Sequence, residues 1–170
     1  MALVAIVAAP LCLGGMQASP PWPGSDISLR AQFLGHEADF ETIVKMAQQD
    51  IHVERIAQDF TWLDTDVSWP RKNVGITQPR WNRYRELFRR AGIPDGILNY
   101  ADPPEVLFPI VSRGLVPAGQ TKGIAYSPLP LAPVLASLDA RPPARFYDNK
   151  GYVIAYKPIK VHWYIYYEQW

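Results

Sequence analysis

The C-terminal part of the chain, residues 145–170, constrains the fold most, because two residue classes alternate strictly within it. From Ile159 to Glu168 the odd positions are Ile, Val, Trp, Ile and Tyr, and the even positions are Lys, His, Tyr, Tyr and Glu. Alternation of this kind, with β-branched and aromatic residues, is typical of a strand with one face toward the core. The sequence therefore predicts a strand over 159–167 whose odd positions are buried.

A second strand is predicted immediately before this one, over 152–157. It follows Asp148-Asn149-Lys150-Gly151, in which Asn and Gly tolerate a positive φ, so the tetrapeptide predicts a hairpin turn back to residues 145–147. Pro158 has no amide hydrogen for a sheet ladder. We expect it either to separate the two strands or to lie on a sheet edge.

The even positions of the predicted C-terminal strand form a row of polar and aromatic side chains. We favour the interpretation that these aromatic residues are core and half-exposed sheet surface, since large aromatic side chains dominate cores and interfaces alike. The alternative is a stacking platform for a base, a sugar or a protein partner. The candidate binding residues of this row are Lys160, His162, Tyr164 and Tyr166.

Composition excludes several classes of protein. A length of 170 residues with 48% hydrophobic and 19% charged residues is typical of one globular domain. The net charge of +1 argues against an electrostatic nucleic-acid binder. A single cysteine, Cys12, excludes an intramolecular disulfide and a multi-cysteine zinc site. The histidines lack zinc-ligand spacing, and Asp64-Thr65-Asp66 lacks the third carboxylate of a calcium loop, so we expect no metal and no cofactor.

Residues 1–18 carry no charge, and residues 1–16 are nearly all apolar. They match the hydrophobic region of a signal peptide better than a membrane-spanning helix, which needs about 20 apolar residues. A cleaved signal peptide is the interpretation we favour; an uncleaved membrane anchor and a lipoprotein modified at Cys12 stay open. Residues 19–26 are expected to form a Pro-rich linker and residues 27–170 a single domain. The expected location is the periplasm, or the outer side of the inner membrane if the protein is tethered.

Two amphipathic helices are predicted, over 36–50 and 77–91. In the first helix Asp39 is expected to cap the start of an apolar stripe. In the second helix Thr77 is the expected N-cap and Gly92 the residue that ends the helix.

The second helix has an arginine-rich side opposite its apolar face. We favour a solvated face whose arginine stems cover the core. The alternative is a docking surface for anionic lipid or an acidic envelope protein. The candidate binding residues on this helix are Arg83, Arg85, Arg89 and Arg90.

Further strands are predicted over 53–63, 97–100, 106–111 and 122–127. Gly123 is expected at a bulge or a close backbone approach. The proline-rich residues 127–143 predict an irregular segment that crosses a sheet edge. These elements together predict an α+β fold, with two amphipathic helices packed on one face of a mainly antiparallel sheet of about four to six strands, in two layers.

Several short motifs lie between residues 33 and 167: Trp81-x-x-Tyr84-x-x-Leu87-Phe88-x-x-x-Gly92, Gly114-Leu115, Lys122-Gly123-Ile124-Ala125-Tyr126, Leu138-Asp139 and Trp163-Tyr164. In these motifs the chain resembles a loose group of short exported proteins of Gram-negative bacteria, periplasmic or lipoprotein-like. The resemblance implies export and a compact domain; it implies no activity and no site residues.

No P-loop, dinucleotide fingerprint or nucleophile elbow occurs in the sequence. Our first hypothesis is therefore a non-enzymatic exported protein that acts through contacts with proteins or the envelope. A small hydrolase or ligand-binding enzyme is the second, with His162 as a base that requires an acidic side chain within hydrogen-bond reach. An inhibitor of a toxin, of the immunity type, is the third.

Overall fold

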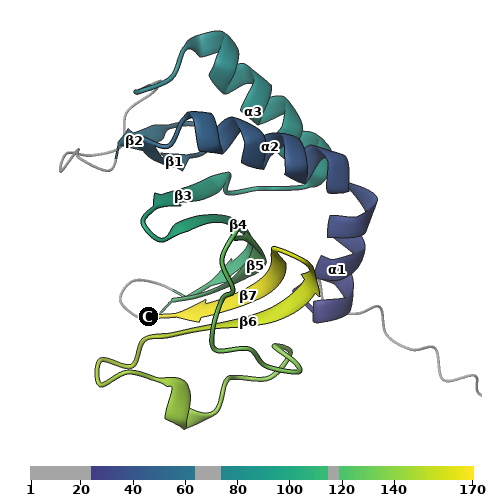
Figure 1. Ribbon diagram of the computed structural model, residues 1–170, viewed down its shortest axis with the longest axis vertical. Helices are drawn as coiled ribbons and strands as arrows, with labels where there is room; N and C mark the ends of the chain where they lie inside the picture. Colours follow the sequence, from purple (N-terminus) through teal and green to yellow (C-terminus); the bar gives the residue numbers. More distant parts are fainter. Residues whose placement is uncertain (1–23, 64–73, 115–118) are drawn as a thin grey trace, which may run out of the picture.

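The computed structural model describes residues 24–63, 74–114 and 119–170. Within these ranges the chain forms three helices and one antiparallel sheet of seven strands in the order β2-β1-β3-β4-β5-β7-β6 (Figure 1). The helices are α1 (Asp26–Gly35), α2 (Glu37–Gln49) and α3 (Gln78–Ala91). The strands are β1 (Val53–Ile56), β2 (Thr61–Leu63), β3 (Ile97–Ala101), β4 (Pro104–Arg113), β5 (Gln120–Tyr126), β6 (Val153–Lys160) and β7 (Trp163–Gln169). The predicted α+β class is confirmed.

The predicted leader, most of the predicted linker and the Asp64–Asp66 segment lie outside the described residues. Ser25 and Asp26, which were expected in the linker, are the N-cap and the first residue of α1. Across the described ranges, no helix is both long enough and apolar enough to traverse a bilayer.

Helix α1 was not predicted, because only Leu29 and Phe33 of its apolar residues are buried and no continuous apolar stripe marks it. A single residue, His36, separates it from α2. The prediction that Asp39 caps α2 is wrong: the helix begins at Glu37, and the Asp39 carboxylate pairs with Arg90 of α3. The limits of α3 are confirmed, since the Thr77 hydroxyl accepts the Arg80 N–H and Gly92 ends the helix with φ 67°.

The prediction of one strand over 159–167 is wrong. Strand β6 ends at Lys160 and β7 begins at Trp163, with Val161 and His162 (φ 67°) forming the turn between them. A bulge between Pro158 and Lys160 adds one residue to β6, so the odd positions of both strands face the same side. The alternation therefore continues through the turn, and no Asn-Gly or Asp-Gly pair marks the reversal.

Other strand predictions need smaller corrections. Residues 53–63 form two strands, β1 and β2, and this division raises the strand number above the predicted four to six. Residues 145–147 lie in and after a 3₁₀ turn (Ala144–Phe146) and not in a strand. Pro158 lies in β6, at the edge of the sheet, as expected. The strands predicted over 97–100, 106–111 and 122–127 are confirmed as β3, β4 and β5.

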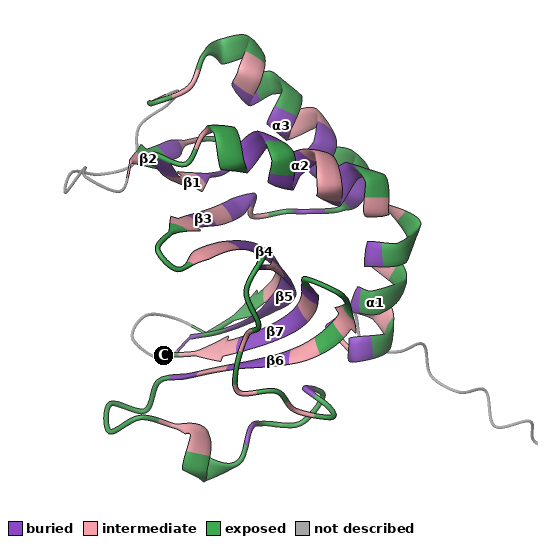
Figure 2. Cartoon of the chain, in the orientation of Figure 1, coloured by how far each residue is buried: buried purple, intermediate pink, exposed green. Residues whose placement is uncertain are grey.

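Both faces of the sheet carry apolar clusters, and the larger one lies under the helices (Figure 2). At its centre the ring of Trp163 lies 4.7 Å from that of Phe33 and 6.0 Å from that of Phe108, measured between centroids. The opposite face carries a smaller cluster that includes Tyr156 and Tyr166. The predicted irregular segment covers part of this face, since Leu131 packs on the cluster and Val134 forms a bridge with Tyr156 at the sheet edge.

Helix α2 is anchored to the sheet at its C-terminal end by Asn99 of β3. The Asn99 side chain is 2% exposed, and its amide nitrogen lies 3.1, 3.2 and 3.3 Å from the carbonyl oxygens of Ala47, Asp50 and Val53. The last carbonyls of a helix have no partner within the helix. The Asn99 amide supplies one from a strand that is distant in sequence.

We expect Asn99→Ala to lower the free energy of unfolding by about 1–3 kcal/mol, because buried carbonyl groups lose their donor. Urea unfolding followed by circular dichroism measures this loss. The control is Asn82→Ala on the exposed side of α3, for which we expect a change within about 0.5 kcal/mol. Equal effects of the two substitutions would contradict the anchoring role of Asn99.

Candidate functional site

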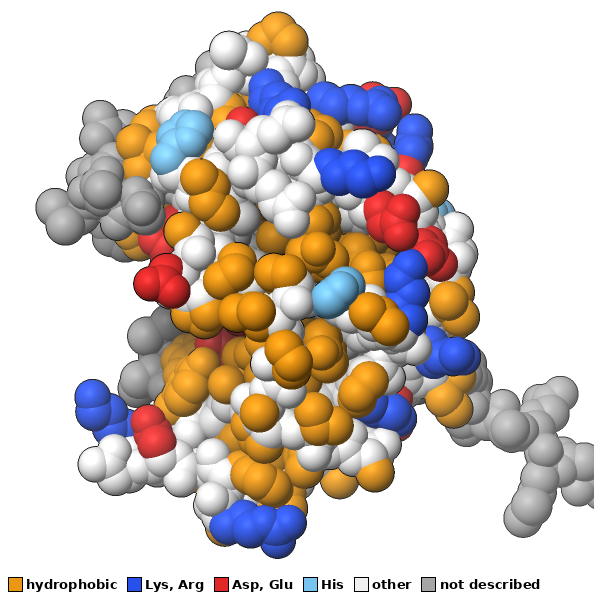
Figure 3. All heavy atoms as spheres, in the orientation of Figure 1, with side chains coloured by type: hydrophobic (Ala, Val, Ile, Leu, Met, Phe, Trp, Pro, Cys, Tyr) orange, Lys and Arg blue, Asp and Glu red, His pale blue; other side chains and the backbone are white. Residues whose placement is uncertain are grey.

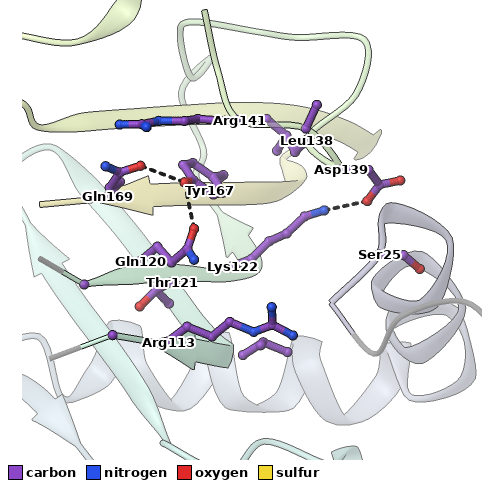
Figure 4. A pocket seen from close by; sticks show the side chains of 14 residues that line it. Ser25, Arg113, Gln120, Thr121, Lys122, Leu138, Asp139, Arg141, Tyr167 and Gln169 are labelled. Atoms are coloured by element: carbon purple, nitrogen blue, oxygen red, sulfur yellow. Dashed lines mark hydrogen bonds and ion pairs between the residues drawn. The ribbon is translucent and has the colours of Figure 1, made fainter. Parts of the chain in front are cut away.

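A hollow of about 810 Å³ lies where the ends of β4, β5 and β7 meet residues 138–141 and the start of α1 (Figure 4). This volume lies within the range of small-ligand sites, about 300–1,000 Å³. Its described lining includes three cationic side chains and one carboxylate: Arg113, Lys122 and Arg141 with Asp139.

Strand register brings most of the polar lining together. Arg113 pairs with Gln120, and Gln120 pairs with Gln169 across β4, β5 and β7. Lys122 and Tyr167 are paired in the adjacent row on the same side of the sheet. Directly opposite residues in antiparallel strands share a face, so segments far apart in sequence form one polar surface.

The floor of the hollow is a network of neutral hydrogen-bonding groups. The Tyr167 hydroxyl lies 3.0 Å from Oε1 of Gln120 and 2.9 Å from Oε1 of Gln169, and the Tyr147 hydroxyl lies 3.0 Å from the same Gln169 oxygen. A phenol has one proton to donate. If both tyrosine hydroxyls donate to Gln169 Oε1, the Tyr167 oxygen can only accept a hydrogen bond from the NH₂ group of Gln120. This requires the Gln120 carboxamide to be rotated by 180°, which exchanges its oxygen and its nitrogen. The Gln169 NH₂ group is then available to an acceptor in the hollow.

A buried ion network forms one wall. Lys122 Nζ lies 2.8 Å from Asp26 Oδ1 and 2.8 Å from Asp139 Oδ1. Asp26 also accepts hydrogen bonds from Lys157 (2.9 Å) and from the Leu138 N–H (3.0 Å). Burial alone raises the pKa of Asp26, but the hydrogen bonds from Lys122, Lys157 and Leu138 outweigh it and lower the pKa to about 2. Asp26 is therefore ionised at neutral pH and holds α1 against β5, β6 and the segment after Ser137.

Arg141 lies at the other end of the hollow. Its Nε donates to the Tyr147 hydroxyl at 2.8 Å, and its guanidinium lies 5.1 Å from the centroid of that ring. Within the described residues, Arg141 forms no ion pair with a carboxylate. Its charge is thus held by a neutral phenol and stays uncompensated beside the Gln169 amide.

The predicted arginine surface of α3 is not a single patch. Because successive residues are turned by about 100°, Arg83 and Arg90 lie on one side of the helix and Arg85 and Arg89 on another. Arg83 pairs with Glu86 at 2.7 Å, and Arg90 pairs with Asp39 and, at 3.8 Å, with Glu86.

The other pair of α3 arginines points elsewhere. The guanidinium of Arg85 lies 5.2 Å from the ring centroid of Trp81, while Arg89 is exposed. The structure brings none of the four arginines into the hollow.

The expected row of Lys160, His162, Tyr164 and Tyr166 does not exist, because the chain reverses at Val161-His162. Lys160 pairs with Glu37 and Glu41 of α2. Tyr166 is fully buried on the opposite side of the sheet, within the same cluster on which Tyr164 packs.

His162 is exposed and lines a second hollow of about 500 Å³ with Tyr126 and Lys160. In the part of the chain that the structure describes, no hydrogen bond or ion pair joins its ring to an acidic side chain. The acid that lines the same hollow, Glu41, pairs with Lys160 at 3.2 Å. The hydrolase hypothesis, which requires an acidic side chain within hydrogen-bond reach of His162, stays a prediction.

Sequence reasoning did not find the residues of the larger hollow. No local pattern distinguishes Arg113, Gln120, Arg141 or Gln169, and only the register of β4, β5 and β7 brings the three strand residues together. Among the described residues, no group of three or more His, Cys, Asp or Glu side chains is arranged to hold a metal ion.

We expect the stabilisation by Asp26 to depend on pH. Because folding lowers the pKa of this carboxyl from 3.8 to about 2, the stabilisation is complete above pH 4 and is lost as the pH falls from about 4 to about 2. The shift corresponds to about 2 kcal/mol. Urea unfolding of the wild type and Asp26→Asn at a series of pH values should show a difference that shrinks over this interval.

Asp59→Asn, in the exposed turn between β1 and β2, is the control. Its difference from the wild type should not shrink by a similar amount over this interval. A difference between wild type and Asp26→Asn that is constant from pH 6 to pH 2 would contradict the role assigned to the network.

Comparisons with known proteins give no relative: no family model matches the sequence, no curated protein matches it, and no solved structure matches the fold. The resemblance to short exported proteins therefore stays a prediction.

Proposed function

We propose that this is a non-enzymatic binding protein whose hollow between β4, β5, β7 and residues 138–141 binds a small anionic ligand. The ligand class is a carboxylate or phosphate that also carries hydroxyl groups. The observation that carries this proposal is Arg141, a cation hydrogen-bonded to a neutral phenol at the rim of a hollow whose other groups include carboxamides and hydroxyls.

The charge balance of the lining supports an anion. Lys122 is already matched by Asp26 and Asp139. The positive charge that the described carboxylates leave unmatched in the lining is therefore that of Arg141, which is bonded to a phenol. Guanidinium groups bind carboxylates and phosphates through parallel hydrogen bonds, which are stronger than bonds between neutral groups.

The arrangement of the groups supports an elongated ligand. Figure 4 shows Arg113 and Lys122 extending toward Ser25 and Asp139, whereas Arg141 points the other way, beside Gln169. The Tyr167 network lies between them. A ligand with its acidic group at one end and hydroxyl groups along its length would meet donors over this whole distance.

Binding without turnover is supported by the same lining. Lys122, the lysine of the lining, is held between the carboxylates of Asp26 and Asp139. With the leader expected at residues 1–18, we place this binding outside the cytoplasm. Envelope contacts and inhibition of a toxin stay predictions, as does tethering to a membrane.

The test is titration of the ¹⁵N-labelled protein with glucuronate, citrate and inorganic phosphate, followed by amide chemical shifts, with glucose as the neutral comparison. We expect at least one anion, and not glucose, to shift the amides of Gln120, Lys122 and Gln169. Arg141→Ala should weaken that binding by about tenfold, since a charge-assisted hydrogen bond is lost.

Arg145→Ala is the matched control. Arg145 lies in the same segment, is also exposed and also stacks on an aromatic ring, with its guanidinium 4.8 Å from the centroid of Phe146, but it does not line the hollow. Binding that Arg141→Ala leaves unchanged, or the absence of any anion effect at millimolar concentration, would refute the proposal.

A further inference from the structure

The sheet face opposite the helices carries a second group of polar side chains, separate from the hollow described above. Tyr156 pairs with Tyr166 across β6 and β7, and Tyr100 pairs with Glu105 across β3 and β4. Leu98 and Ile154 pack on the same cluster. Figure 3 shows a hollow lined by hydrophobic side chains with an acidic side chain at its bottom.

Two carboxylates converge on this cluster. Glu168 Oε1 accepts a hydrogen bond from the Tyr152 hydroxyl at 3.4 Å. Burial raises the pKa of Glu105, the Tyr156 hydroxyl partly offsets the rise, and the nearby charge of Glu168 adds to it. Burial likewise raises the pKa of Glu168. Two half-buried acids, of which one raises the pKa of the other by its charge, are stabilised in their ionised forms by a positive charge nearby.

Buried polar atoms at the same place lack partners. Within the described residues, the Tyr166 hydroxyl, Glu105 Oε1 and Arg55 Nε are buried and make no hydrogen bond. The Tyr166 side chain is 0% exposed. Burial raises the pKa of its hydroxyl, and the charge of Glu168 raises it further. Arg55 lowers this pKa, whereas Tyr100 and Glu105 raise it. The Tyr166 ring lies in one cluster with Tyr156, and Tyr100 packs against that cluster. Buried polar groups in proteins are nearly always hydrogen-bonded, so a cluster of such atoms indicates a site for a polar ligand group.

We propose that this hollow binds the protonated amine of a small organic molecule with an apolar body. Among the described residues around Tyr166, two glutamates outnumber one cation, Arg55. Arg55 also donates to the Asp95 carbonyl at 2.9 Å. The tyrosine rings attract a cation through their faces, and the phenol oxygens and Glu105 Oε1 accept its N–H groups. Leu98 and Ile154 supply apolar contact for the rest of the ligand.

This site differs from the anion-binding hollow in both place and charge. Lys122 and Tyr167 face the helices, whereas Tyr156 and Tyr166 lie in the cluster on the other side of the sheet. The two sites can therefore be tested separately, and loss of one leaves the other intact.

The experiment compares benzylamine with benzyl alcohol, which has the same ring and a similar size but no charge. Titration of the ¹⁵N-labelled full chain at pH 7 should show saturable shifts for benzylamine at amides of Tyr100, Glu105 and Glu168. Benzyl alcohol should bind at least tenfold more weakly. Glu168→Gln and Glu105→Gln should each weaken benzylamine binding by about tenfold, because a charge-assisted hydrogen bond is lost.

Glu86→Gln on α3 is the control and should leave binding unchanged, since this exposed glutamate pairs with Arg83 far from the cluster in the fold. Equal affinity for the amine and the alcohol would reduce the site to apolar contact and overturn the proposal, as would no benzylamine binding. If a glutamine variant does not fold, the wild-type comparison of the two compounds still decides between these outcomes.

Discussion

The close packing of β4, β5 and β7 at Gly123 is the constraint on which the rest of the structure depends. A β-carbon at this position would collide with the carbonyl oxygen of Phe108 and the ring of Tyr166. The β4 bulge between Pro109 and Val111 lies opposite Gly123, as expected for a glycine that permits close backbone approach. This contact fixes the register that places Lys122 under α1 and Tyr166 on the other face.

Polar groups attach the helices to this sheet at two points. Asn99 of β3 and Arg80 of α3 both donate hydrogen bonds to groups at the C-terminal end of α2. Arg80 donates to the Asp50 carboxylate at 2.8 Å and to the Met46 carbonyl at 3.0 Å. This explains an arginine in the first turn of α3, where the helix dipole disfavours it. At the opposite end of the sheet Asp26 holds α1. Because buried charges are costly without partners, each attachment requires its whole set of contacts, and the set around Asp26 also shapes the wall of the larger hollow.

The net charge of +1 conceals a separation of charge between the two faces of the sheet. Cationic groups gather around the hollow on the helix side, and Glu105 and Glu168 gather among tyrosines on the other. The low net charge argues against a large electrostatic surface of the kind that a nucleic-acid binder requires. It does not exclude small sites in which two or three charges act at short range, where screening is weak.

The sequence alone determined the elements whose signals are local. The caps at Thr77 and Gly92 predicted α3, and side-chain alternation between glycines predicted β3, β4 and β5. These signals are readable because capping and side-chain periodicity depend on neighbours within a few residues. The turn at Val161-His162 was missed because a bulge kept the alternation in phase. The candidate sites depended on tertiary structure throughout. Gln120 meets Gln169, and Asp26 meets Lys122, only through strand pairing and helix packing between distant segments, and no local pattern encodes which distant partner a polar side chain finds.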